Sequence, residues 1–553
     1  MIHNPILRGF NPDPSIVRVG DDYYIATSTF EWFPGVQIHH SRDLKHWRLL
    51  TRPLDHVSQL DLRGVGPSQG VWAPCLTWDK GTFYLVYTVV TAFYCNMYDT
   101  HNYIVTAPDI TGPWSEPAEL SSFGFDPSLF HDDDGRKYMV CMVTDHRVPK
   151  KYAGRLIVQE YDTVNRCMIG DFHEVYQAKD IFLEGPHIFK RNGWYYLFCA
   201  DTGTGEGHGQ SMLRSRHVFG PYEMDRPDFG NRTQPREAYS MLTTRPVPDH
   251  PLQKAGHADL VQTQQGDWYI VHLCGRPLPQ RNPEDAPRFA GCRRYMLGRE
   301  TALQRVVWTE DGWLRLANGT NLPDLCLPDP DLPPCPWPAE PTRDDFDLPQ
   351  LPMHYQTLRL PLTDRDLSLT ARPGWLRLYG GNGLSSRFRQ SLIARRLTEL
   401  SAVMETRVDF QPVFYKQMAG LVLYYDCDNY LYLHVTHDEE LGRVVTLLQA
   451  ENKRYTSPFG YIALPPEGAV RLRIALKEGM ASFAWEAEGV CHQLSGEVDA
   501  SFLSDEACTE GWFTGTMAGL CCQDLTGAHL PADFDYMEMR VSSSVPSMSD
   551  SPC

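Results

Sequence analysis

The sequence contains no apolar run of the length needed to span a membrane, and its first ten residues lack a basic segment followed by an apolar one. A transmembrane helix needs about 20 predominantly apolar residues. A secretory signal peptide needs a basic region followed by an apolar region. The sequence therefore predicts neither, and we expect a cytoplasmic protein with no membrane partner.

Basic residues are few relative to acidic ones. Lys and Arg number 51 against 69 Asp and Glu, for a formal net charge of −18. Binding to nucleic acid or to an anionic membrane requires basic surface. The charge balance therefore argues against both partners and is compatible with a neutral substrate.

Cysteine pairs with metal-binding spacing are also missing. The chain has 15 cysteines but no Cys-x-x-Cys motif, which argues against a zinc site. Cys141, Cys199 and Cys274 lie in apolar segments, so we expect small buried residues in a reducing compartment.

Turn-forming residues, by contrast, are abundant. The 42 glycines and 42 prolines indicate many turns and a β-rich structure, and 553 residues exceed one ordinary hydrophobic core. We therefore expect at least two domains.

A unit recurs five times in the first half of the chain. Each copy has a glycine followed by an aromatic, apolar run, as in Gly81-Thr-Phe-Tyr-Leu-Val-Tyr and Gly193-Trp-Tyr-Tyr-Leu-Phe. The five glycines are Gly20, Gly81, Gly135, Gly193 and Gly266. A recurring β-unit of this size is typical of a propeller, in which packing side by side covers the faces of small sheets.

A conspicuous residue opens the strand before each glycine. These residues are Asp13, Trp72, Asp126, Glu184 and His257; the last four stand nine positions before their glycine and Asp13 stands seven before. Asp-Pro is also a common turn dipeptide, but turns alone do not explain polar residues at one repeat position. Since inner strands of a propeller surround one axis, we expect these five side chains to converge at one site.

A proline-rich segment separates the repeats from a second β-rich region. We predict a catalytic propeller over residues 1–320, a semi-rigid linker over 321–343, a β-sandwich over 344–541 and a disordered tail over 542–553. Asp345 and Asp533 are candidates for a structural Ca²⁺ site, with solvated turn residues as the alternative. We expect no required cofactor.

The motifs together resemble glycoside hydrolase family 43, and in particular its two-domain β-xylosidases. The resemblance extends from about residue 3 to residue 540. The segments that carry it are Asn11-Pro-Asp-Pro-Ser15, Ser28-Thr-Phe-Glu-Trp-Phe-Pro-Gly35, Trp72-Ala-Pro74, Phe125-Asp126, Glu184-Gly-Pro-His187, Gly256-His257, Leu297-Gly-Arg-Glu-Thr301, Arg372-Pro-Gly374 and Gln417-Met-Ala-Gly420.

The resemblance implies an all-β protein, with a five-bladed β-propeller followed by a jelly-roll-like β-sandwich, and an inverting, exo-acting glycosidase. It implies that Asp13 is the general base, Glu184 the general acid and Asp126 the carboxylate that orients the acid and adjusts its pKa. It implies a pocket built by Phe30, Trp72, Thr204, His257, Arg299, Trp512 and Phe513. It also implies an oligosaccharide substrate and a homo-oligomer, such as a tetramer.

One position departs from the family pattern. Thr144 stands where a tryptophan is often found, so we expect a wider pocket on that side. The principal expectation is release of xylose from non-reducing ends of β-1,4-xylooligosaccharides. An α-L-arabinofuranosidase activity, alone or in addition, is the first alternative. A retaining fructan hydrolase and a non-catalytic sugar-binding protein are further alternatives.

Overall fold

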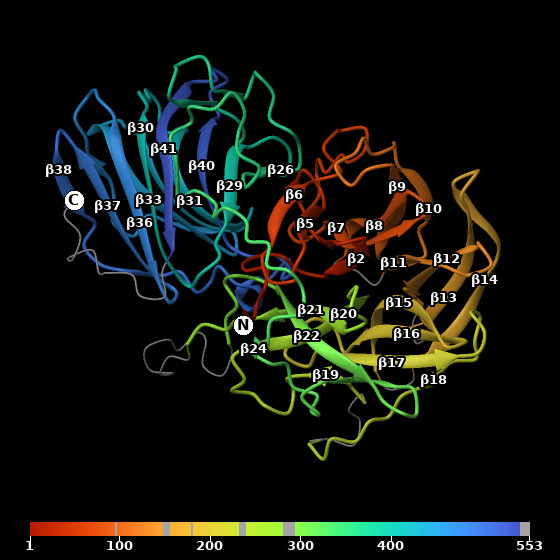
Figure 1. The fold of residues 1–553 in the computed structure, drawn as a ribbon. Coiled ribbons are helices and arrows are strands. Elements are labelled where there is room, and N and C mark those ends of the chain that lie inside the picture. The colour runs from red at the N-terminus through yellow and green to blue at the C-terminus, as the bar shows by residue number, and fades with distance from the viewer. Residues whose placement is uncertain (94–96, 148–154, 179–180, 232–238, 280–292, 542–553) are drawn as a thin grey trace.

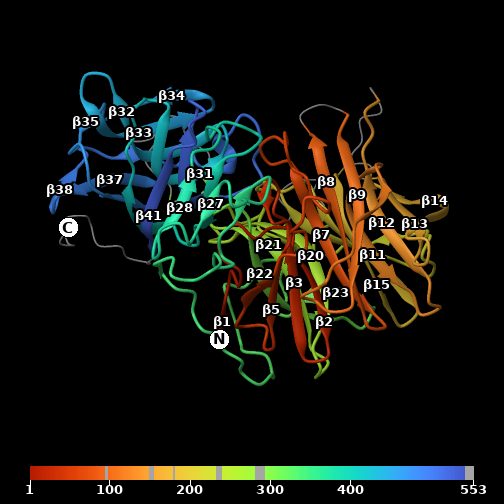
Figure 2. The ribbon, with the colours of Figure 1, turned by 90° about the horizontal axis from the view of Figure 1, so that it is seen from above.

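The computed structural model describes residues 1–93, 97–147, 155–178, 181–231, 239–279 and 293–541. The described part is built almost entirely from β-strands, and its one short helical turn is the 3₁₀ turn η2 (Asp505–Ala507). No helix in these ranges is long and apolar enough to cross a membrane. Figures 1 and 2 show the two domains side by side.

Five antiparallel sheets form the first domain, each from strands that follow one another along the chain, except that β4 lies between β3 and β5 and belongs to another sheet. The first sheet contains β2 (Ser15–Val19), β3 (Asp22–Thr27), β5 (Gln37–Ser41) and β6 (Arg48–Thr51). The second contains β7 (Gly70–Asp79), β8 (Thr82–Ala92), β9 (Asp99–Ala107) and β10 (Ala118–Ser121). The third contains β11 (Gly124–His131), β12 (Lys137–Val143), β13 (Arg155–Asp162) and β14 (Cys167–Gln177). The fourth contains β15 (Leu183–Arg191), β16 (Trp194–Asp201), β17 (Gly209–Ser215), β18 (Glu223–Met224) and β19 (Leu242–Thr243). The fifth contains β20 (Gln253–Gln262), β21 (Trp268–Gly275), β22 (Glu300–Trp308) and β23 (Leu314–Leu316).

The first strands of the five sheets form a closed ring. Strands β2, β7, β11, β15 and β20 each contact the next, and β20 contacts β2. The five recurring glycines form the turns after these strands, all with φ between 62° and 93°, a conformation that glycine adopts without strain. The predicted five-bladed propeller is confirmed.

The second domain consists of two packed sheets. One sheet contains β25 (Arg343–Asp344), β27 (Leu367–Ser368), β28 (Leu376–Tyr379), β30 (Ser401–Asp409), β36 (Val470–Lys477), β37 (Met480–Ala487), β38 (Val490–Gln493), β39 (Val498–Asp499) and β41 (Pro531–Val541). The other contains β29 (Ser391–Arg396), β31 (Gln417–Asp426), β32 (Asn429–Asp438), β33 (Gly442–Glu451), β34 (Arg454–Thr456), β35 (Ile462–Ala463) and β40 (Met517–Asp524).

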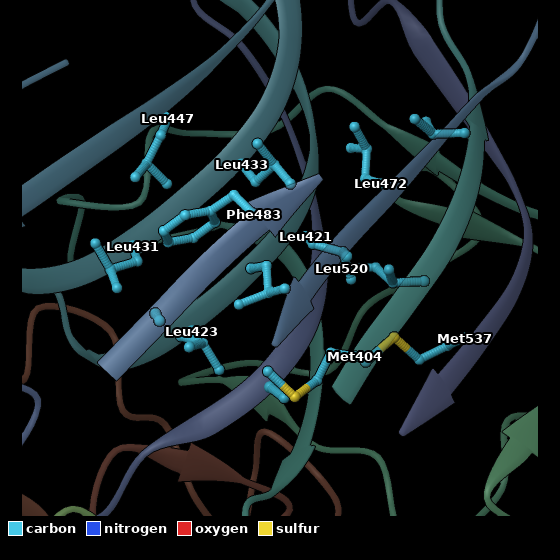
Figure 3. Packing of buried hydrophobic residues seen from close by; sticks show 14 of the residues in the cluster. Met404, Leu421, Leu423, Leu431, Leu433, Leu447, Leu472, Phe483, Leu520 and Met537 are labelled. Atoms are coloured by element: carbon cyan, nitrogen blue, oxygen red, sulfur yellow. The ribbon is translucent and has the colours of Figure 1, made fainter. Parts of the chain in front are cut away.

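The core of the second domain lies between the inner faces of these sheets. Alternate residues of facing strands supply it, because successive side chains of a strand point to opposite faces. Figure 3 shows Leu421, Leu433, Leu472 and Phe483 within this core, and all four are buried. The predicted β-sandwich is confirmed.

One short strand pair joins the N-terminus to the linker, and another joins the propeller region to the sandwich region. Strand β1 (Ile2–His3) pairs with β24 (Cys326–Leu327), which lies inside the predicted linker. Strand β4 (Trp32–Phe33) of the propeller region pairs with β26 (Thr357–Leu358) of the sandwich region. The linker thus packs along the propeller, while the tail predicted to be disordered, 542–553, lies outside the described residues.

Candidate active site

Local irregularities direct side chains toward the propeller axis. The strands β7, β11, β15 and β20 contain Trp72, Asp126, Glu184 and His257 within their first five residues, and each strand has a shift in register next to that residue. Asp13, Asp126 and His257 adopt positive φ values of 53°, 55° and 52°. Bulges redirect side chains, and non-glycine residues at positive φ are concentrated at functional sites.

All the predicted site residues line one pocket of about 700 Å³. The pocket lies where the open mouth of the propeller axis meets the sandwich domain. Its predicted members are Asp13, Asp126, Glu184, Phe30, Trp72, Thr204, His257, Arg299, Trp512 and Phe513. The structure therefore brings together residues that are up to 500 positions apart in sequence (13 and 513).

Asp13 is buried and held by two partners. Arg299 Nη1 donates a hydrogen bond to Asp13 Oδ1 at 2.5 Å, and Ser28 Oγ donates to Asp13 Oδ2 at 2.7 Å. Arg299 is only 2% exposed, so its charge is screened little by solvent. The ion pair and the serine hydroxyl fix the position of the Asp13 carboxyl group, as the role of a general base requires.

Glu184 and Asp126 lie close enough to influence each other's protonation. Burial raises the pKa of Glu184 well above its usual value, and the nearby Asp126 and Asp13 carboxylates raise it further. Burial and the charge of Asp13 raise the pKa of Asp126 as well, while a hydrogen bond from the Gly185 N–H at 2.9 Å opposes this rise. Glu184 Oε1 has no hydrogen-bond partner. The backbone N–H therefore favours ionisation at Asp126 and leaves the proton on Glu184.

His257 packs tightly in the floor of the pocket. Its Nδ1 lies 3.7 Å from Asp13 Oδ1, and a Cβ atom at Gly185 would approach its Nε2 to 2.6 Å. Burial lowers the pKa of His257 to about 4, so the ring is neutral near pH 7. A neutral imidazole offers both a hydrogen-bond donor and an acceptor, which suits contact with a sugar hydroxyl.

Aromatic rings from both domains form the walls. Phe513 stacks on Phe30 with a centroid distance of 6.1 Å and meets Trp72 edge-on at 5.3 Å. The Phe513 N–H donates to Ser68 Oγ at 3.0 Å, which ties this sandwich segment to the propeller. Trp512 lies at the rim and is 38% exposed. The sandwich domain thus closes part of the pocket.

Several pocket residues were not predicted from the sequence. Lys254 Nζ donates to Asp505 Oδ2 at 3.0 Å and to Glu506 Oε1 at 2.7 Å, and this group bridges the two domains at the pocket. Phe93 and Tyr98, between β8 and β9, also line the pocket. Lys254 stands three residues before His257, but no other unit has a charged residue at the equivalent position, and Asp505 and Glu506 belong to no repeat.

Thr144 does not line the pocket. It follows β12, and its N–H donates to the Phe123 carbonyl at 3.2 Å. The aromatic residues Phe93, Tyr98 and Phe125 line the pocket instead. The expectation of a wider pocket on the Thr144 side stays a prediction.

The candidate calcium ligands bind arginines instead. Asp533 accepts hydrogen bonds from Arg377 at 2.7 Å and from Arg372 at 3.1 Å, and Asp345 accepts one from Arg343 at 2.7 Å. Within the described ranges, no group of three or more His, Cys, Asp or Glu side chains is arranged to hold a metal ion. These two residues do not fit a calcium site, and the presence of calcium stays an untested prediction.

Comparison with known proteins identifies both domains. Residues 2–314 match the model of glycosyl hydrolases family 43, and residues 343–540 match that of the beta xylosidase C-terminal concanavalin A-like domain. The chain is 42% identical to a Bacillus subtilis protein named beta-xylosidase, over 98% of this chain and 99% of that one. It is 44% identical to the xylosidase/arabinosidase 43B of Humicola insolens, over 98% and 97% of the two chains.

A solved structure supports the same assignment. The xylan beta-1,4-xylosidase from Bacillus halodurans C-125 superposes with a TM-score of 0.92 and 46% sequence identity, over 98% of this chain and 100% of that one. The propeller and the sandwich are therefore shared with known glycosidases, and the chain belongs to glycosyl hydrolases family 43.

Proposed function

We propose that this glycosidase is an inverting, exo-acting β-xylosidase that releases xylose from the non-reducing ends of β-1,4-xylooligosaccharides. The observation that carries the proposal is the contrast between two buried carboxyl groups in one pocket. Asp13 is ion-paired with Arg299, whereas Glu184 has a raised pKa and an oxygen with no hydrogen-bond partner. Glycoside hydrolysis by inversion needs one carboxylate and one carboxylic acid.

Asp13 is the base in this mechanism. A water molecule between Asp13 and the sugar attacks the anomeric carbon, and Asp13 takes a proton from that water. The distance between the two carboxyl groups of inverting enzymes, about 6.5–9.5 Å, leaves room for the water. Arg299 holds the Asp13 carboxyl group in place through their ion pair.

Glu184 is the acid. As the bond between the anomeric carbon and the glycosidic oxygen breaks, Glu184 donates its proton to that oxygen. The leaving group departs as a neutral alcohol, and Glu184 becomes a carboxylate. Asp126 acts through Glu184, because its negative charge keeps the proton on Glu184 until the leaving group needs it.

The closed pocket supports exo action. Phe513, Asp505 and Glu506 of the sandwich domain line it together with Trp72 of the propeller, so the second domain covers part of the pocket, as a site that takes chain ends requires. The relatives named for xylosidase activity share this two-domain arrangement over nearly their full length.

An α-L-arabinofuranosidase activity is the second candidate. The Humicola insolens relative is named for both xylosidase and arabinosidase activity. The same acid and base serve both reactions, so assays with the two 4-nitrophenyl glycosides separate them. A retaining fructan hydrolase would give a product with the same anomeric configuration as its substrate. A sugar-binding protein without catalysis would give no hydrolysis.

Proton NMR of xylobiose hydrolysis tests the principal proposal. Inversion predicts that α-xylose appears first and β-xylose follows by mutarotation. If β-xylose appears first, the role of Asp13 as a base is wrong. If no xylose appears while an arabinofuranoside is cleaved, the second candidate replaces the first.

Two further expectations stay proposals. The protein is expected to form a homo-oligomer, such as a tetramer, which light scattering after gel filtration measures directly. A cytoplasmic location is likewise a prediction, which cell fractionation of the source organism tests.

A further inference from the structure

A second cavity of about 650 Å³ lies at the domain junction, apart from the sugar pocket. The first propeller blade, the linker and strand β29 surround it, and Figure 1 shows β29 on the side of the sandwich that faces β5 and β6. Its wall contains six Lys or Arg side chains and, among the described residues, the single carboxylate of Glu340. The six cations are Arg8, Lys45, Arg48, Arg52, Arg395 and Arg396. This excess is notable in a chain with a net charge of −18.

Three of the six have carboxylate partners at the rim of the cavity. Arg8 pairs with Glu399 and Lys45 with Asp329, while Arg395 lies 3.4 Å from Glu340. No described carboxylate lies within ion-pair distance of Arg48, Arg52 or Arg396. Arg48 is exposed and lies over the Trp337 ring at 3.9 Å.

Arg52, Arg395 and Arg396 are buried, 8%, 7% and 9% exposed, and of these three only Arg395 lies within ion-pair distance of a described carboxylate, that of Glu340. The guanidinium groups of Arg52 and Arg396 meet at one neutral atom: Arg52 Nη2 donates to Gln37 Oε1 at 2.7 Å, and Arg396 Nη1 donates to the same oxygen at 2.9 Å. Their other acceptors are backbone carbonyls and the Gln356 amide. Arg396 Nη2 is buried and has no hydrogen-bond partner.

This arrangement leaves Arg52 and Arg396 without a carboxylate at ion-pair distance, and only the more distant charge of Glu340 favours their charged forms. A buried charge needs a counter-charge and satisfied hydrogen bonds. Burial lowers the pKa of Arg52 to about 9, and burial together with Arg52 lowers that of Arg396. The neighbouring His39 stays neutral, because burial and these two arginines lower its pKa to about 3. An anion in the cavity would relieve the repulsion between the two guanidinium groups.

We propose that this cavity binds a small oxyanion, such as inorganic phosphate or sulfate, between the guanidinium groups of Arg52 and Arg396. The planar guanidinium fork matches the oxygen spacing of such anions. Arg48 and Arg395 add positive charge around the same space. The oxyanion acts as a structural ligand that joins the first blade to strand β29.

The cavity is connected to the segment that carries the base. Gln37 Nε2 donates to Asn11 Oδ1 at 2.9 Å, and Arg396 Nε donates to the Phe10 carbonyl. Asn11 stands two residues before Asp13. A bound oxyanion therefore stabilises the contact between the sandwich domain and residues 10–13.

Titration of the full-length protein with sodium phosphate tests the proposal, with sodium chloride used to hold the ionic strength constant. We expect calorimetry to show one saturable site per chain, and the melting temperature to rise with phosphate more than with matched chloride. Arg52→Gln should weaken phosphate binding at least tenfold. Arg48→Gln replaces an exposed side chain and keeps the test valid if Arg52→Gln fails to fold; it should weaken binding by a smaller factor.

The matched control is Arg407→Gln. Arg407 lies on β30, is half exposed and pairs with Asp535 outside the cavity, so its loss should leave phosphate affinity unchanged. The proposal is overturned if phosphate gives no saturable heat and no more stabilisation than chloride. It is equally overturned if the cavity variants and Arg407→Gln bind phosphate with the same affinity.

Discussion

The two cavities at the domain junction are opposites in charge. The sugar pocket is lined by five carboxyl groups and two cations, whereas the second cavity is lined by six cations and one carboxylate among the described residues. The pocket carboxyl groups are Asp13, Asp126, Glu184, Asp505 and Glu506, and its cations are Lys254 and Arg299. Segment 10–13 contributes to both, since Asn11 lines the second cavity and Asp13 lines the pocket.

The comparison shows how burial acts on opposite charges. Burial disfavours the charged form of any group. It raises the pKa of Glu184 and lowers that of Arg52. In the pocket this produces the protonated acid that hydrolysis needs. In the second cavity it leaves a site that gains stability when an anion enters.

Asp13→Asn should produce the largest loss of hydrolytic activity. It should affect the sugar pocket and leave anion binding in the second cavity unchanged. Loss of a general base lowers the rate by about 10²–10⁴-fold, and every substrate needs the activated water. We therefore expect this loss in kcat/KM for both xylobiose and 4-nitrophenyl xyloside, with phosphate-dependent stabilisation retained. Asp21→Asn, an exposed residue of the same blade, is the control. Near-normal hydrolysis by Asp13→Asn would rule out the assigned base.

Glu184→Gln should depend on the leaving group. We expect a loss of about 10²–10⁴-fold on xylobiose, whose leaving alcohol needs a proton, and a smaller loss on the aryl xyloside, whose phenol leaves without much assistance. Steady-state kinetics on both substrates measures the difference. Glu223→Gln, an exposed residue of the same blade, should behave as the wild type. Equal losses on the two substrates would contradict the acid role.

Asp126→Asn should shift the pH dependence of activity. The Asp126 carboxylate raises the pKa of Glu184, so its removal lowers that pKa and moves the basic limb of the kcat/KM profile to lower pH. Asparagine still offers an oxygen to the Gly185 N–H, so the local geometry is preserved. A basic limb that does not move, in a folded variant, would show that the two groups are not coupled.

Glu184→Gln also gives a stability test with a defined sign. Burial, then Asp126 and Asp13, raises the folded-state pKa of Glu184 well above its usual value near 4.5. A raised carboxyl pKa gives the fold stability at low pH that is lost as the pH rises from the unfolded-state pKa through the folded-state pKa. The melting temperature of Glu184→Gln relative to the wild type should therefore increase as the pH is raised above about 4.5. A constant difference would mean that the pKa of Glu184 is not raised in the folded state.

Trp512→Ala should give the smallest effect. The ring lies at the rim, so its loss should remove about 0.5–1.5 kcal/mol of aromatic contact with the substrate. We therefore expect the KM for xylobiose to rise about 2- to 10-fold and the melting temperature to stay unchanged. Trp78→Ala is the control, because Trp78 is 39% exposed and lies outside the pocket.

Phe513→Ala should lose more activity and some stability, since its ring packs against Phe30, Trp72 and Phe93. Wild-type kinetics in both variants would show that this segment does not close the pocket.

The sequence was sufficient for the propeller and for the central residues of the site. A repeat places equivalent residues at equivalent points of equivalent sheets, so the five openings could be expected to converge. Asp13, Asp126, Glu184 and His257 were predicted in this way, and the family resemblance added Arg299 and Phe513. The wider pocket expected from Thr144 stays a prediction, because Thr144 itself does not line the pocket.

Only the tertiary structure decided what lies between the domains. The contact of Lys254 with Asp505 spans 251 positions, and the guanidinium groups of Arg52 and Arg396 meet although no repeat relates them. Such contacts depend on how the sandwich packs against the propeller, because side chains from unrelated segments become neighbours only when two domain surfaces meet. The sequence determined the chemistry within the propeller, where geometry repeats, and the packing of the domains determined the closure of the pocket and the charge of the second cavity.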